Sequence, residues 1–148
     1  MRTTLVQDWM TAELVTVGPD MTLPDALQLM RARGIRRLPV CEKGKLVGIV
    51  TRGDLRGAQP SEATSLSIFE LHYLVGRITL SQIMTRHPVT VTPATTIGDA
   101  ANIMLQRKIS GLPVMQAERL VGIITESDIF RLVVKTWQQQ DTLMPEAV

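Results

Sequence analysis

The chain contains two copies of one pattern, related by a single offset without gaps. The offset that places Met10-Thr11 on Met84-Thr85 also aligns the segments that follow. The aligned pairs are Val15-Thr16-Val17 with Val89-Thr90-Val91, Pro19 with Pro93, Asp25-Ala26 with Asp99-Ala100, Leu38-Pro39-Val40 with Leu112-Pro113-Val114, Leu46-Val47-Gly48-Ile49 with Leu120-Val121-Gly122-Ile123, and Thr51 and Asp54 with Thr125 and Asp128. Chance does not produce a register of this length, so the chain is an internal duplication.

Each copy predicts the element order β-α-β-β-α. Thr22 precedes Asp25 by three residues, a spacing typical of a helix start, and Gly34 favours the helix end. Thr96 and Asp99 repeat the helix-start pattern. The expected strands are Val15–Val17, Leu38–Cys41 and Leu46–Val50 in the first copy, and Val89–Val91, Leu112–Met115 and Leu120–Ile124 in the second.

The two copies differ after their last strand. After Asp54 the chain enters a loop, and a further helix is expected to begin near Ser65, whereas a longer helix is expected from Asp128 toward Trp137. We expect an α/β (α+β) fold of two tandem repeats packed with pseudo-two-fold symmetry, because a repeat of about 50 residues buries too little surface to fold alone. The expected divisions are residues 1–62 for repeat 1, 63–79 for an inter-repeat helix or linker, 80–137 for repeat 2 and 138–148 for a flexible C-terminal tail.

Composition argues against several classes of function. Aromatic residues make up 3% of the chain and the net charge is +2 with scattered basic residues, whereas a nucleic-acid surface needs stacking rings or a basic stripe. Cys41 is the single cysteine, so no internal disulfide is possible. The sequence has no P-loop, no metal-ligand cluster and no nucleophile–base pattern. We therefore expect no nucleic-acid partner, no metal and no enzymatic activity. We also expect no membrane span and a cytoplasmic location.

The repeated motifs resemble those of the cystathionine-β-synthase-type (CBS) domain family. The resemblance covers Val6–Leu55 and Leu80–Leu132, and it rests on Met-Thr…Val-Thr-Val…Pro, Ile-x-x-Leu-Pro-Val and Leu-Val-Gly-Ile-x-Thr-x-x-Asp, in this order in both copies. Residues 64–71 resemble, more weakly, the inter-repeat segment of acetoin-utilisation-type CBS proteins.

The resemblance implies a non-catalytic regulatory pair of repeats, often called a Bateman module. Such a pair binds an adenosyl ligand, AMP, ADP, ATP or S-adenosylmethionine, in the cleft between its repeats and needs no other cofactor. It also implies a homodimer, and a regulated partner protein to which the energy or metabolite state is signalled. Among these ligands, AMP, ADP or ATP is favoured.

Thr51-x-x-Asp54 and Thr125-x-x-Asp128 are the main candidates for the ligand site. A Thr that ends a strand three residues before an acid is also a common helix cap, and spacing alone favours that interpretation. The resemblance implies that these Thr and Asp residues hold the ribose hydroxyls of the ligand. A carboxylate can accept from two vicinal hydroxyls at once, so both roles are compatible.

Arg36 and Arg37 are the candidates for contacts with the ligand's phosphates, because the guanidinium pairs bidentately with phosphate. The alternative is a pair of solvated loop arginines. The second copy has Ser110-Gly111 at these positions, so the two sites are predicted to be unequal. A nucleotide held by Asp128 would point its phosphates toward Arg36 and Arg37.

The site on Asp54 would instead face Ser110 and His87. It is predicted to be weaker, empty or suited to a less charged adenosyl ligand. His87 has a simpler alternative as a satisfied loop histidine.

The resemblance implies that Ile35 and Ile109 contact the adenine, with core packing as the alternative. Gly18 and Thr92 would offer backbone groups to the adenine edge. Two other functions stay open: a dimerising scaffold with vestigial nucleotide sites, and an enzyme with an unrecognised site, which no sequence feature supports.

Overall fold

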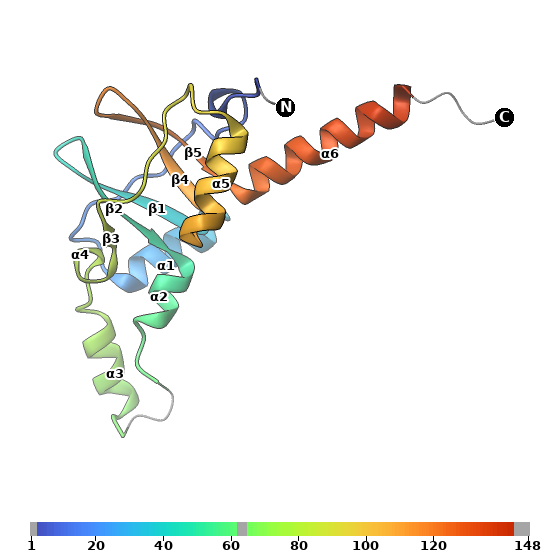
Figure 1. Cartoon of the computed structure of the whole chain (residues 1–148). Coiled ribbons are helices and arrows are strands. Elements are labelled where there is room, and N and C mark those ends of the chain that lie inside the picture. Colours follow the sequence, from blue (N-terminus) through green and yellow to red (C-terminus); the bar gives the residue numbers. More distant parts are fainter. Residues whose placement is uncertain (1–2, 62–64, 144–148) are drawn as a thin grey trace. The chain divides into compact units, whose positions relative to one another are not determined.

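The structure is a computed structural model that describes residues 3–61 and 65–143 (Figure 1). It mixes helices and strands, as the sequence predicts, and divides into two compact units. One unit is Val15–Pro88, and the other joins Met1–Leu14 to Val89–Val148. The elements are the 3-10 helix η1 (Val6–Asp8), α1 (Leu23–Arg33), β1 (Arg37–Glu42), β2 (Lys45–Thr51), α2 (Arg52–Gly57), α3 (Ile68–Val75), α4 (Leu80–Ile83), β3 (Thr85–Arg86), α5 (Ile97–Arg107), β4 (Gly111–Gln116), β5 (Arg119–Thr125) and α6 (Glu126–Leu143).

In the unit Val15–Pro88, local signals set the ends of each element. The Thr22 side chain accepts from the backbone N–H of Asp25 at 3.4 Å and starts α1. Gly34 ends α1 with a φ of 62°, which glycine adopts without steric cost. Strands β1 and β2 are antiparallel, and the turn between them needs positive φ at Lys43 and Gly44 (50° and 78°). The predicted capping residue, helix end and hairpin are therefore confirmed.

The other unit repeats this arrangement with α5, β4, β5 and α6. Thr96 starts α5 by accepting from the Asp99 N–H at 3.1 Å, and β4 pairs with β5 in the register that β1 uses with β2. Each unit has its own hydrophobic core. The buried residues are Val17, Leu23, Ala26, Met30, Leu38, Val40, Val50, Leu55, Leu80 and Met84 in one unit, and Val6, Val91, Ile97, Ala100, Met104, Leu112, Val114, Ile124 and Leu132 in the other.

The two copies exchange their opening segments. Leu80, at the start of the second sequence copy, is fully buried in the core that contains the sheet of the first copy, while Val6 is fully buried in the core of the second. Equivalent hydrogen bonds fix both segments: Leu80 N donates to Met21 O at 2.9 Å, and Val6 N donates to Thr95 O at 2.8 Å. The compact units therefore differ from the sequence repeats, whose boundaries describe the duplication.

Two motif glycines make room for this exchange. A Cβ on Gly48 would lie 2.6 Å from Met84 Sδ, and one on Gly122 would lie 2.6 Å from Met10 Sδ. No real side chain tolerates such a distance without displacement of the methionine. The Met-Thr and Leu-Val-Gly-Ile motifs of the sequence are thus structural partners, each Met-Thr pair packing beside the glycine of the other copy.

The prediction of a first strand in each copy is wrong, because the structure has only a single bridge residue there. Val17 and Val91 form single parallel bridges to Val40 and Val114, and no strand covers Val15–Val17 or Val89–Val91. The chain turns into Pro19 or Pro93 directly afterwards, and proline has no N–H with which to extend a ladder.

Two helices differ from their predicted bounds. Helix α3 begins at Ile68 after the cap Ser67, whose side chain accepts from the Glu70 N–H at 3.2 Å; residues 62–64, which precede this region, lie outside the described residues. Helix α6 continues to Leu143, into the segment predicted as a tail, because the run Gln138–Gln140 favours helix and no Gly or Pro interrupts it. Residues 144–148 of the predicted tail lie outside the described part of the chain.

Candidate functional site

Asp54 lies at the junction of β2 and α2, where it forms a reciprocal helix cap with Thr51. Thr51 N donates to Asp54 Oδ2 at 2.9 Å, and Asp54 N donates to Thr51 Oγ1 at 3.1 Å. The helix-cap interpretation of this motif is therefore confirmed. Asp54 is half-buried, and the hydrogen bonds to its carboxylate among the described residues engage Oδ2 alone.

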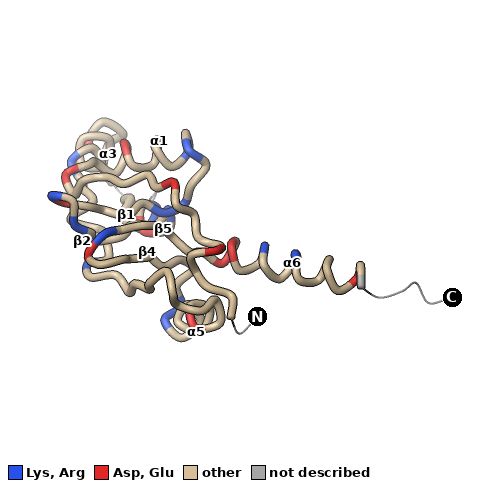
Figure 2. Tube along the Cα trace, turned by 90° about the horizontal axis from the view of Figure 1, so that it is seen from above, with Lys and Arg blue, Asp and Glu red and all other residues tan. Residues whose placement is uncertain are grey.

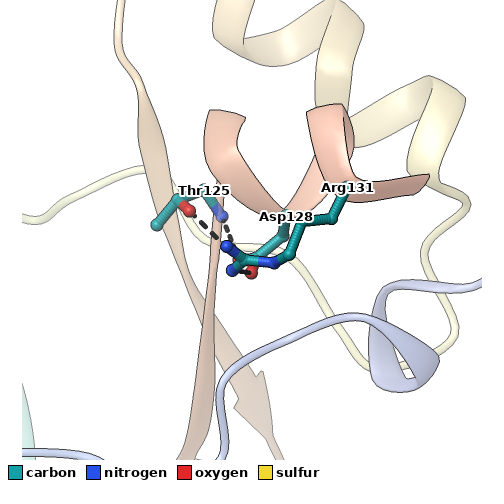
Figure 3. Close-up of polar contacts among 3 residues, drawn as sticks. All are labelled: Thr125, Asp128 and Arg131. Atoms are coloured by element: carbon teal, nitrogen blue, oxygen red, sulfur yellow. Dashed lines mark hydrogen bonds and ion pairs between the residues drawn. The ribbon is translucent and has the colours of Figure 1, made fainter. Parts of the chain in front are cut away.

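Asp128 lies at the matching junction of β5 and α6, but its carboxylate has more partners (Figure 3). Thr125 donates to Oδ2 twice, from its backbone N–H at 2.8 Å and from Oγ1 at 3.1 Å. Arg131 donates from Nη2 to Oδ1 at 2.5 Å. Asp128 is 2% exposed, whereas the Arg131 side chain is 63% exposed, so an exposed side chain pairs with a buried one.

The two junctions use the threonine hydroxyl in opposite ways. Thr51 Oγ1 accepts from a backbone N–H, whereas Thr125 Oγ1 donates to the carboxylate. The duplication places Gly57 at the position that matches Arg131. The same Thr-x-x-Asp motif therefore gives two different electrostatic environments.

Arg36 and Ile35 line a hollow of about 350 Å³ in the unit Val15–Pro88. The other lining residues are Met30, Arg31, Gly34 and Arg52. Arg52 N donates to Arg36 O at 2.8 Å, and this backbone hydrogen bond joins the residue before β1 to the start of α2. Three of the lining residues are arginines, and arginine is suited to an anionic ligand group.

Sequence reasoning missed Arg31 and Arg52 in this hollow. In the sequence, Arg31 is a basic residue in the last turn of a helix, and Arg52 is the residue after Thr51. Arginines at both kinds of position are common on solvated surfaces, so neither position indicated a binding site. Arg37 is the first residue of β1 and pairs in register with Thr51, so it lies on the strand rather than on the expected loop before it. The predicted joint role of Arg36 and Arg37 stays a prediction.

The remaining predicted residues have local roles in the structure. Ile35 and Ile109 are half-buried and pack against the two hydrophobic cores. A Cβ on Gly18 would meet open space. Thr92 N donates to the Thr95 side chain at 3.0 Å.

Ser110 and His87 lie at element ends. Ser110 is half-buried, and its carbonyl accepts from Glu126 N at 3.0 Å at the start of α6. His87 is exposed in the left-handed region, with a φ of 48°. Their predicted roles opposite Asp54 also stay predictions.

Charges of both signs are interspersed along the trace (Figure 2). Along α6, acidic positions near the start are followed by the two basic residues Arg131 and Lys135. Among the described residues, no group of three His, Cys, Asp or Glu side chains could hold a metal ion. None of the helices in the described ranges combines the length and apolarity that crossing a membrane requires.

Comparison of the sequence with known protein families finds a match to one family. The CBS domain model matches residues 6–61 and 80–135, which are the two sequence repeats. A CBS domain-containing protein from Dictyostelium discoideum is 36% identical over 139 residues, which cover 88% of this chain and 92% of that protein. The inosine-5'-monophosphate dehydrogenase of Korarchaeum cryptofilum is 35% identical over 84% of this chain, but the match spans only 23% of that enzyme.

Solved structures agree with this result. A protein named for acetoin utilization from Vibrio cholerae has a TM-score of 0.77 and 33% identity, covering 97% of this chain and 99% of its own. The complex of CBSX2 with AMP has a TM-score of 0.75 and 30% identity, covering 90% and 98% of the two chains. The CBS domain pair of MJ0100, solved with 5'-methylthioadenosine and S-adenosyl-L-methionine, has a TM-score of 0.75 and 29% identity over 90% and 98%. The duplicated motifs, the two repeated units and these matches together show that the chain belongs to the CBS-domain family, as a pair of CBS repeats.

Proposed function

We propose that this chain is a non-catalytic regulatory module that binds an adenosyl ligand, with AMP, ADP or ATP favoured, and signals its presence to a partner protein. The relatives solved with AMP, and with 5'-methylthioadenosine and S-adenosyl-L-methionine, support an adenosyl ligand. The observation that carries the proposal is the carboxylate of Asp128, 2% exposed at the first turn of the 18-residue helix α6. A carboxylate at this place offers oxygen acceptors for the hydroxyls of a sugar.

The Thr-x-x-Asp motifs serve two purposes in this proposal. Oδ2 accepts from the threonine backbone in both copies and caps the helix. Oδ1 then accepts from ribose hydroxyls. An ionised carboxylate offers about four acceptor positions, so the cap and the ribose contact are compatible.

The hollow beside Arg36 supports a ligand with phosphate groups. Arg31, Arg36 and Arg52 line it, and its volume of about 350 Å³ admits a phosphate tail. Ile35 lines the same hollow and supplies an apolar surface for an adenine ring. These features favour AMP, ADP or ATP over S-adenosylmethionine, whose sulfonium is cationic.

Calorimetric titration of the whole chain with AMP, ATP and S-adenosylmethionine tests the proposal. The matched variant is Asp54→Asn with Asp128→Asn, because asparagine still accepts the capping hydrogen bond but lacks the charge. We expect AMP binding to the double variant to weaken by about ten- to a hundredfold, since a charge-assisted hydrogen bond contributes roughly 1.5–3 kcal/mol. Equal affinity of both proteins, or no binding of any adenosyl ligand, would reject the proposal.

A dimerising scaffold is the second candidate function, and the exposed helix faces favour it. No residue of α3 is buried, and Phe69 and Tyr73 are 82% and 62% exposed. On α6, Phe130 and Trp137 are 63% and 67% exposed. We propose that these faces are covered in a homodimer. Light scattering behind size exclusion tests this: Phe69→Ser with Trp137→Ser should yield monomers if the faces form the interface, and an unchanged mass would contradict it.

A further inference from the structure

The two acids of the proposed ligand sites differ in one contact that the chain itself supplies. At Asp128, Arg131 holds Oδ1 while Thr125 donates twice to Oδ2 (Figure 3). Three of the roughly four acceptor positions of this carboxylate are therefore filled. At Asp54, Thr51 N fills one position and is the one donor among the described residues, while Thr51 Oγ1 accepts from Asp54 N.

A vicinal diol needs two acceptor positions at once, and it competes with the guanidinium for them. Asp128 retains about one position while Arg131 is bound, so a ribose cannot place both hydroxyls on this carboxylate. Arg131 is the donor that can leave, since its side chain is 63% exposed and its departure leaves the backbone of α6 unchanged. Thr125 N, in contrast, is fixed by the end of β5.

We propose that Arg131 determines the ligand specificity of the Asp128 site, by holding the carboxylate in the empty state and leaving it only for a ligand whose phosphate binds the guanidinium in its place. This inference rests on the proposed function. Adenosine and 5'-methylthioadenosine must displace Arg131 without offering it a new partner. AMP and ATP replace the lost carboxylate with a bidentate phosphate. The Asp54 site has Gly57 at the position that matches Arg131, so no guanidinium there competes with an uncharged nucleoside for the carboxylate.

Two variants in opposite directions test the inference. Arg131→Met in the Asp54→Asn background removes the guanidinium but keeps a long helix-forming side chain. Gly57→Arg in the Asp128→Asn background adds one, and a Cβ on Gly57 meets open space. Calorimetry measures the ratio of adenosine to AMP dissociation constants in each background. Lys135→Met is the matched control, because Lys135 lies one turn further along α6 and contacts the Trp9 ring instead.

We expect Arg131→Met to bind adenosine about tenfold more tightly and to reduce the preference for AMP by at least that factor, with Lys135→Met unchanged. Gly57→Arg should raise the preference for AMP at the Asp54 site. An unchanged ratio in the folded Arg131→Met protein, with AMP still bound, overturns the role of Arg131 and leaves the nucleotide site standing. Absence of AMP binding to the unmodified chain overturns both proposals together.

Discussion

The strand–helix junctions at Thr51 and Thr125 contain the same motif, so two copies of it can be compared within one molecule. Both place an acid three residues after the threonine that ends a strand, and both cap the following helix through Oδ2. Asp54 is half-buried at the start of a 6-residue helix, whereas Asp128 is 2% exposed at the start of an 18-residue helix and is paired with Arg131. The capping role thus follows from the motif, while the ion pair of the acid depends on the residue three positions beyond it, which is Arg131 in one copy and Gly57 in the other.

The largest effect is expected where the two sequence copies exchange their opening segments. Leu80→Ala removes a fully buried side chain and should lower the free energy of unfolding by about 3 kcal/mol, as in other core truncations. Hydrogen exchange should locate the loss in β1 and β2, because Leu80 packs in that core. Loss of protection in β4 and β5 alone would contradict the exchange.

A smaller difference should separate the two acids. Asp128→Ala removes a buried side chain and leaves the part-buried Thr125 N–H and hydroxyl without their acceptor, so we expect a loss of about 2 kcal/mol. Asp54→Ala removes a half-buried cap and should cost about 1 kcal/mol. Urea unfolding of the two single variants measures the difference, and equal losses would show that burial does not distinguish the junctions.

Arg131→Met should change stability much less than Asp128→Ala. The Arg131 side chain is 63% exposed, so water screens the pair from that side, and we expect its loss to cost about 1 kcal/mol. Thr125 continues to satisfy Oδ2 in the variant. A loss as large as that of Asp128→Ala would mean that Arg131 is needed to fold the junction, and thermal unfolding of both variants decides this.

The smallest effect concerns Cys41, whose counterpart in the second copy is Met115. Burial raises the pKa of the Cys41 thiol, so a smaller fraction is thiolate at a given pH than in an unfolded chain. Alkylation by iodoacetamide at pH 8 should therefore be severalfold slower in the native chain than in urea, and its rate should keep rising as the pH increases further. Equal rates in both states would show that Cys41 is not protected.

Short-range patterns predicted the parts of the fold that depend on neighbouring residues. The caps at Thr22 and Thr96, the turn at Gly44 and the strands of each hairpin follow from hydrogen bonds and short apolar runs within a few positions. The same patterns overestimated the strand at Val15–Val17, because a single long-range bridge to Val40 is all that forms there. They also ended the C-terminal helix too early, since polar residues such as Gln138 are compatible with helix.

The sequence predicted both acids of the candidate site, but of the cations near them in the structure it predicted only Arg36 and not Arg31, Arg52 or Arg131. Asp54 and Asp128 were identified because the duplication repeats the whole Thr-x-x-Asp motif. Arg131 belongs to one copy only, and its pairing with Asp128 depends on the rotamer it adopts above a buried acid. Arg31 and Arg52 meet Arg36 because the end of α1, the start of β1 and the start of α2 converge on one hollow, which no local pattern indicates.

The sequence by itself determined the duplication, the helix, hairpin and helix order of each copy and the family, because repetition and periodicity are properties of the chain. Only the tertiary structure decided that Val6 and Leu80 are buried in each other's copies, and which cation holds which acid. The physical reason is the range of the interactions. Caps and turns are formed by residues three or four positions apart, whereas hydrophobic burial joins segments more than fifty positions apart once the whole chain has folded.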